Sequence, residues 1–77
     1  MPITCFVHIK TSVGKAFEVL ENVKKIEGVV EAYTVTGEYD IIAKVEVKDL
    51  KDLGDKIVKK IHSIDGVLST VTSIAIT

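Results

Sequence analysis

The sequence of 77 residues predicts an α+β domain with the element order β-α-β-β-α-β, in which two helices cover one face of a four-stranded antiparallel sheet. Two observations support this prediction. Apolar residues alternate at period two in residues 3–10 and 41–48, β-branched residues are frequent in residues 29–35, and apolar residues recur at three and four residues in two other segments. In addition, residues 26–30 and 64–68 have nearly the same sequence, which indicates two successive β/α units.

The first unit is predicted to consist of a strand and a helix. Apolar and polar residues alternate from Ile3 to Lys10, so one side of this strand faces a core. Residues 11–14 interrupt this alternation. From Lys15 onward the apolar residues recur at three and four residues, which predicts an amphipathic helix that Gly28 ends. Its apolar positions are Ala16, Val19, Leu20, Val23 and Ile26.

The chain then forms a predicted hairpin and a second helix. The second strand runs from Val29 to Val35 and the third from Ile41 to Val47, joined by a corner at residues 36–40. Asp49 is placed to cap the second helix, and the fourth strand is predicted for residues 67–77. The predicted apolar stripe of this helix consists of Leu50, Leu53, Ile57, Val58, Ile61 and Ile64.

This element order is that of the ferredoxin-like split βαβ fold. Right-handed crossovers place both helices on one face of the sheet, so the other face stays open. A chain this short buries a small core, so we expect a symmetric dimer through sheet-on-sheet contact, with a partly solvated sheet as the alternative. The residues expected on the open face are Phe6, His8, Ile42, Lys44 and Glu46.

Composition narrows the classes of function. The net charge is −1, and all ten basic residues are lysines, which argues against nucleic-acid readout by this chain alone. No apolar run approaches the ~20 residues of a membrane span, and no signal peptide is recognisable, so a cytoplasmic location is expected. Many Lys, Glu and Ile residues with few amides are typical of a thermophilic source.

No residues have the spacing of a catalytic or metal site. Cys5 is the sole cysteine and is predicted to be a small core residue in mid-strand. His8 and His62 lie far apart in the sequence and share no ligand spacing, and Lys15 lacks the flanking residues of a phosphate-binding loop. The sequence therefore predicts a protein that is not an enzyme and that needs no metal or cofactor.

The hairpin corner Thr36-Gly37-Glu38-Tyr39-Asp40 carries more chemistry than a turn requires. Glu38 and Asp40 can accept hydrogen bonds from an ammonium group, Gly37 lets backbone amides approach a carboxylate, and Tyr39 offers a stacking surface. With hydroxyls of the last strand, this set suits a small zwitterion such as an amino acid. Alternatively, Asp40 bonds its own turn, and the hydroxyls reflect β propensity. The hydroxyl residues are Ser69, Thr70, Thr72 and Ser73.

The sequence resembles a known family over essentially its whole length. Gly37-Glu38-Tyr39-Asp40 before the strand at 41–45 resembles a Gly-x-Tyr-Asp hairpin, and Gly66-Val67 before Thr70-x-Thr72 resembles the last strand of the same family. The stretch Val29-x-x-Ala32-Tyr33-x-Val35-x-Gly37 resembles the segment that precedes this hairpin. The family is the effector-binding, or RAM, domain of the leucine-responsive regulator (Lrp)/AsnC proteins.

The resemblance implies a ferredoxin-like fold, dimers that assemble into rings, commonly octamers, and an amino-acid effector bound between dimers. It implies ligand contacts by Gly37, Tyr39, Asp40, Thr70 and Thr72, with Asp40 at the amino group and Tyr39 as a wall of the pocket. Glu38 joins this set because its carboxylate lies in the same corner.

Full members of the family carry an N-terminal helix-turn-helix domain, whereas this sequence starts at the first strand and resembles the stand-alone form. We therefore expect an amino-acid-sensing regulatory module without DNA binding of its own, which can co-assemble with a full-length regulator. One alternative is an oligomerisation module that binds no ligand. Another is the related ACT type of domain, which normally sits on an enzyme.

Overall fold

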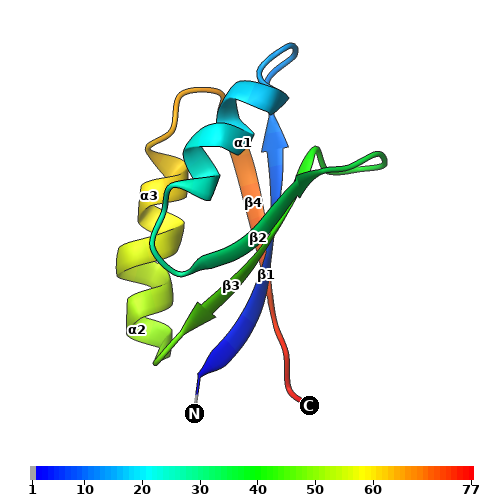
Figure 1. Cartoon of the computed structure of the whole chain (residues 1–77). Coiled ribbons are helices and arrows are strands. Elements are labelled where there is room, and N and C mark those ends of the chain that lie inside the picture. Colours follow the sequence, from blue (N-terminus) through cyan, green and yellow to red (C-terminus); the bar gives the residue numbers. More distant parts are fainter. Residues whose placement is uncertain (1) are drawn as a thin grey trace.

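In the computed structural model, which describes residues 2–77, the four strands form one antiparallel sheet (Figure 1). The strands are β1 (Ile3–Thr11), β2 (Val29–Thr34), β3 (Ile41–Val47) and β4 (Val67–Ile74). Their order across the sheet is β2-β3-β1-β4, so the first strand lies inside the sheet while β2 and β4 form its edges. This topology confirms the predicted ferredoxin-like fold.

Helices cover one face of the sheet, on the left in Figure 1. The first helix is α1 (Ala16–Lys24), which is shorter than predicted at its C-terminal end. The second helical region is continuous but not uniform: α2 (Leu50–Asp52) leads into the π-helical segment η1 (Leu53–Val58), which continues as α3 (Lys59–His62). As predicted, the Asp49 carboxylate caps this region, accepting a hydrogen bond of 2.8 Å from the amide of Asp52.

The buried side chains of this helical region recur every four residues. Leu53, Ile57 and Ile61 are buried and belong to the core between the helices and the sheet. The predicted burial of Leu50 is wrong: it lies in the first turn, outside this row, and is 56% exposed.

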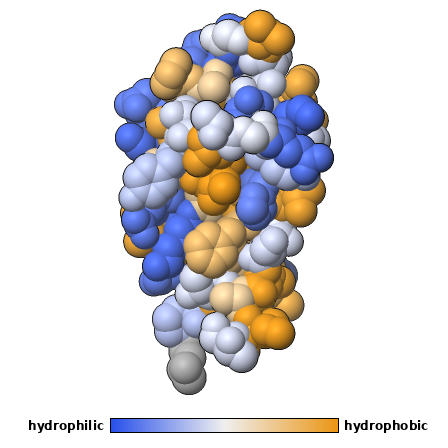
Figure 2. All heavy atoms as spheres, turned by 90° about the vertical axis from the view of Figure 1, so that its right-hand side faces the viewer, coloured by the Kyte–Doolittle hydropathy of each residue, from blue (hydrophilic) through white to orange (hydrophobic). Residues whose placement is uncertain are grey.

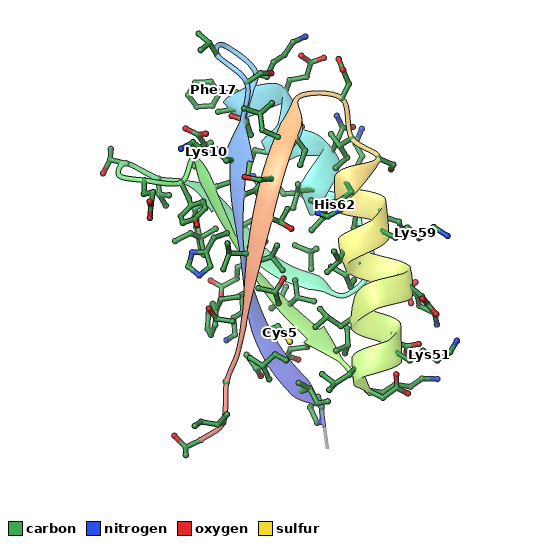
Figure 3. The ribbon with its side chains drawn as sticks, turned by 180° about the vertical axis from the view of Figure 1, so that it is seen from behind. Cys5, Lys10, Phe17, Lys51, Lys59 and His62 are labelled. Carbon is green, nitrogen blue, oxygen red and sulfur yellow. The ribbon has the colours of Figure 1, made fainter. Side chains whose placement is uncertain are left out.

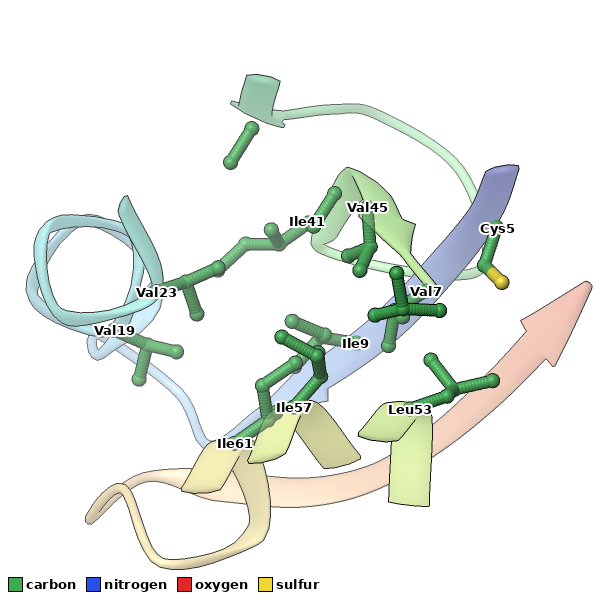
Figure 4. Packing of buried hydrophobic residues seen from close by; sticks show 13 residues of the cluster. Cys5, Val7, Ile9, Val19, Val23, Ile41, Val45, Leu53, Ile57 and Ile61 are labelled. Atoms are coloured by element: carbon green, nitrogen blue, oxygen red, sulfur yellow. The ribbon is translucent and has the colours of Figure 1, made fainter. Parts of the chain in front are cut away.

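The core fills the space between the sheet and the helices (Figure 4). Cys5, Val7 and Ile9 of β1 are fully buried, as the alternation predicted, together with Val19 and Val23 of α1. Burial raises the pKa of the Cys5 thiol, because the thiolate would be poorly solvated there. Cys5 is therefore a core residue, in agreement with its predicted role.

The two repeated segments form the same turn. Gly28 and Gly66 have φ values of +103° and +101°, at which the backbone of a residue with a side chain would be strained. In each turn the residue after the glycine donates its amide to an isoleucine carbonyl, Val29 to Ile26 and Val67 to Ile64. The duplication predicted from the sequence is therefore a duplication of helix-to-strand connections.

The last strand ends earlier than predicted, at Ile74 and not at Thr77. Ile74 pairs with Cys5, and the amide of Ala75 still donates to the carbonyl of Thr4 at 2.9 Å.

The sheet face opposite the helices, here called the open face, carries the residues predicted for it. Residues directly opposite each other in the register share a face, and Phe6 pairs with Lys44, His8 with Ile42 and Thr4 with Glu46. Figure 2 shows this face, with apolar side chains between polar ones. The open face also includes Tyr33, Val71 and Ser73.

Candidate functional site

The hairpin corner projects from the sheet on the side away from the helices (Figure 1). A hydrogen bond of 2.8 Å from the Val35 amide to the Asp40 carbonyl closes its base. Gly37 has a φ of +113°, and a Cβ built there would meet nothing within 4 Å. The backbone conformation, and not lack of space, therefore explains the glycine.

Asp40 fastens the corner to β1 through both its backbone and its side chain. Its Oδ2 accepts a hydrogen bond of 2.8 Å from the amide of the buried residue Thr11, and its own amide donates to the Ile9 carbonyl at 3.0 Å. The alternative in which Asp40 bonds its own turn is therefore wrong for the side chain, whose partner is 29 residues away. Since a carboxylate has two oxygens, Asp40 can hold Thr11 with one and accept from a ligand with the other.

Tyr39 and Glu38 are placed differently from Asp40. The Tyr39 ring lies against His8, with ring centroids 5.5 Å apart and planes tilted by 54°. Because His8 belongs to the open face, Tyr39 extends that face toward the corner. Glu38 is exposed at the tip of the corner.

A hollow of about 320 Å³ lies between the corner and the first turn of α1. Phe17 of this turn is 76% exposed and is labelled in Figure 3. This corner hollow is lined by Ala16, Phe17, Thr34, Val35, Thr36 and Asp40. Its size is within the range of small-molecule sites, and Asp40 provides its carboxylate.

The hydroxyl residues of β4 divide between the two faces of the sheet. Thr70 pairs with Ile9 and Thr72 with Val7, so both lie on the side of the helices. Ser69 and Ser73 lie on the open face, because they pair with Lys10 and Phe6. The four hydroxyls therefore do not form one group.

His62 of α3 joins Thr70, with 2.8 Å between Nε2 and Oγ1 (Figure 3). Beside this pair lies a hollow of about 460 Å³, the β4 hollow, which is lined by His62, Val67, Leu68, Ser69 and Thr70. The sequence prediction gave His62 no role. One pattern in the sequence points to the pair: His62 precedes Gly66 by four residues and Thr70 follows it by four, so the turn brings them together.

The predicted ligand-binding residues are not all brought together within one chain. Gly37, Glu38, Tyr39 and Asp40 lie in the β2–β3 corner, whereas Thr70 and Thr72 lie on the opposite edge strand β4, with β1 in between. The corner hollow and the β4 hollow share no residue. Within one chain, the two groups therefore line separate hollows on either side of β1.

Two further observations concern metal binding and membrane-spanning helices. Among residues 2–77, no group of three or more His, Cys, Asp or Glu residues is arranged to hold a metal ion. Across the same residues, no helix has the length and apolar character needed to cross a membrane.

The family model of the Lrp/AsnC ligand-binding domain matches residues 4–77. The HTH-type transcriptional regulator FL11 of Pyrococcus abyssi is 38% identical over 71 residues, which make up 92% of this chain and 46% of FL11. The chain spans less than half the length of the curated regulators that it matches, between 39% and 48% of each.

Solved structures agree in fold. The crystal structure of TTHA0845 from Thermus thermophilus aligns with a TM-score of 0.91 at 36% identity and covers 97% of this chain and 94% of that one. E. coli AsnC aligns with a TM-score of 0.90 at 30% identity over 97% of this chain and 51% of AsnC. A shorter match, 47% identical over 49 residues, covers 64% of this chain and 10% of a homocitrate synthase from Sulfolobus acidocaldarius.

Proposed function

Since the chain belongs to the Lrp/AsnC ligand-binding domain family, we propose that it is an amino-acid-sensing regulatory module that serves transcription regulation. Its relatives include transcription regulators from Pyrococcus, so its regulatory class rests on the family. The proposal that the effector is an amino acid goes beyond the family match, and it rests on the chemistry of the corner.

The observation that carries this proposal is the way Asp40 is held. The bond from Thr11 fixes the carboxylate at the wall of the corner hollow, where an ammonium group can reach its second oxygen. Glu38 supplies a second carboxylate, Gly37 exposes the backbone amides of the corner, and Tyr39 stands beside them as a wall. On the β4 side, Thr70 and Thr72 provide hydroxyl donors.

The effector site is proposed to lie between subunits. The corner and the β4 hollow lie on opposite sides of β1 and share no lining residue, so in this proposal the ligand contacts both by bridging two copies. The open face supplies the first interface. Phe6 is 37% exposed on the same face as Tyr33 and Val71, and a second sheet would cover all three. Dimers formed in this way would then assemble into a higher oligomer, for which an octamer is the form proposed.

Contact with DNA is proposed to be made by residues outside these 77. The chain has no arginine for bidentate contacts to bases or phosphates, and its net charge of −1 does not favour attraction to a polyanion. In this proposal the module acts by co-assembly with a DNA-binding regulator of the same family, in the cytoplasm. In this proposal, effector binding changes DNA binding by the regulator through the contacts between subunits of the oligomer.

Two other functions are favoured by specific observations. An oligomerisation module without a ligand is favoured by the hydrogen bond from Thr11, because this bond already gives the Asp40 carboxylate a structural role. The match to part of a homocitrate synthase favours a sensor attached to an enzyme. The two are distinguished by what co-purifies with the tagged chain: a regulator of the same family or an enzyme of amino-acid metabolism.

Thermal unfolding with each of the twenty amino acids tests the sensing proposal. A ligand that binds the folded state raises Tm, and at about 5 mM even a millimolar Kd gives a measurable shift. We expect at least one amino acid to stabilise the wild type and the D40N variant to lose that shift, since the amide side chain still accepts from Thr11 but has no charge. D55N, which removes an exposed carboxylate of η1, should keep it. No shift with any amino acid would leave the oligomerisation module.

A further inference from the structure

His8 lies within a row of side chains that crosses the open face from edge to edge. The register pairs Tyr33 with Ile42, Ile42 with His8, and His8 with Val71, so these four residues form one row across all four strands. Both ends of the row are exposed, Tyr33 by 58% and Val71 by 48%. A second sheet that covers the two ends of the row therefore also covers His8.

A second copy of this chain is the partner that suits the open face. Besides the apolar residues of the row, the strands place two lysines and two glutamates on this face, so its charges balance and an identical face is not repelled. These residues are Lys10, Glu31, Lys44 and Glu46. In a contact between two open faces, His8 is then the side chain whose charge can change near neutral pH.

The three side chains beside His8 offer no carboxylate to a charged imidazole. Ile42 and Val71 flank it in the row. The third neighbour is the Tyr39 ring, whose centroid lies 5.5 Å from that of the imidazole. When a second sheet excludes water from this apolar and aromatic surrounding, the neutral imidazole is favoured over the protonated one.

The charged groups around His8 on this side of the sheet come from β1, β2, β3 and the hairpin corner, while β4 carries none. All of them belong to the same chain as His8, so they act on it in the monomer and in the dimer alike. They are Lys10, Glu31, Lys44, Glu46, Glu38 and Asp40. Dimerisation adds the loss of water, a balanced set of lysines and glutamates, and the His8 of the second copy, which carries the same charge when protonated.

We propose that protonation of His8 opens the sheet-to-sheet dimer, so that assembly of this module responds to pH. The inference rests on the dimer of the proposed function and adds a means of regulating it. Because the charged imidazole loses water in the interface, the dimer binds fewer protons than two separate chains. Affinity between the copies is therefore highest above the usual range of histidine titration, which is centred at about pH 6.5, and falls as pH drops through this range.

Sedimentation equilibrium of the whole chain at pH values of about 7.5 and about 5.5 tests this inference. Each dimer covers two His8 side chains, so the wild-type dissociation constant should rise about tenfold or more between these values. H8Q keeps a polar side chain that cannot be protonated, so its dissociation constant should change less than about twofold. H62Q removes the other of the two histidines, which lies on the helix side of the sheet beside Thr70, and should keep the wild-type pH dependence.

Three results would overturn the inference. They are a pH dependence in H8Q equal to that of the wild type, a wild-type dimer that tightens at the lower pH, and a chain that is monomeric at both pH values. None of them decides the sensing proposal, because that proposal is tested by the thermal shift with amino acids at a single pH.

Subunit exchange gives the same comparison for a dimer too tight to dissociate at measurable concentrations. Isotope-labelled and unlabelled protein are mixed, and the appearance of mixed dimers is followed by native mass spectrometry. Wild-type exchange should be about tenfold faster at the lower pH, and H8Q should show no such acceleration. Equal acceleration in both proteins would assign the pH effect to other groups and overturn the role of His8.

Discussion

Replacement of Asp40 by alanine tests whether its carboxylate holds the hairpin corner on β1. The carboxylate accepts from Thr11 at 2.8 Å, and Thr11 is only 8% exposed. A hydrogen bond to a charged group contributes about 1.5–3 kcal/mol, and leaving the buried amide unpaired costs a similar amount. We therefore expect D40A to lower the free energy of unfolding by about 2 kcal/mol, which for a domain of this size lowers Tm by roughly 8–16 °C.

Urea unfolding at a fixed protein concentration measures this loss, because assembly also contributes to stability. D40N retains an oxygen acceptor and should lose less than about 1 kcal/mol. E38A removes an exposed neighbouring carboxylate and should stay within about 0.5 kcal/mol of the wild type. Amide hydrogen exchange at Thr11 should accelerate in D40A alone. A D40A protein as stable as E38A would refute the structural role assigned to Asp40.

Three further predictions concern the turn glycines, the open face and the core. G28A should lose roughly 1 kcal/mol more stability than G37A in urea unfolding. Both glycines have a positive φ, but only at Gly28 would the new Cβ lie 2.9 Å from Ile57 Cδ1. Equal losses in the two variants would contradict this packing. F6E should shift the proposed sheet-to-sheet dimer toward monomer in light scattering, whereas L50E, at an exposed leucine of α2, should leave that dimer intact. Cys5 should react with a thiol reagent only on unfolding, and because its folded pKa is raised, its contribution to stability should be lost as pH rises above the ordinary value of 9.0.

The sheet could be predicted from the sequence because its faces follow a local period. Alternation in β1 and β3 identified the core residues and the open face, and the repeated Gly-Val pairs identified where each helix connects to the following strand. The π-helical winding of η1 could not be predicted, since it depends on how Leu53, Ile57 and Ile61 meet the sheet. For the same reason the exposure of Leu50 was missed.

The candidate site was predictable only in part. The corner is contiguous, so its carboxylates and tyrosine could be found together, but the partner of Asp40 lies 29 residues earlier in the chain and becomes visible only in the folded sheet. The contact between His62 and Thr70 spans eight residues and depends on the turn at Gly66, which brings a helix end beside an edge strand. A contact across 29 residues, such as that of Asp40 with Thr11, carries no local pattern.

Subunit complementation tests the central claim, a site built from the corner of one copy and the β4 hollow of another. One variant, E38A/D40N, loses the corner, and the other, H62Q/T70V, loses the hollow, so neither should bind the effector amino acid alone. Unfolded together and refolded, the two should form mixed oligomers in which about a quarter of the sites combine an intact corner with an intact hollow. Calorimetric titration of the mixture should therefore recover about a quarter of the wild-type stoichiometry at near wild-type affinity. A mixture that binds nothing, although mixed oligomers are present, would contradict the account.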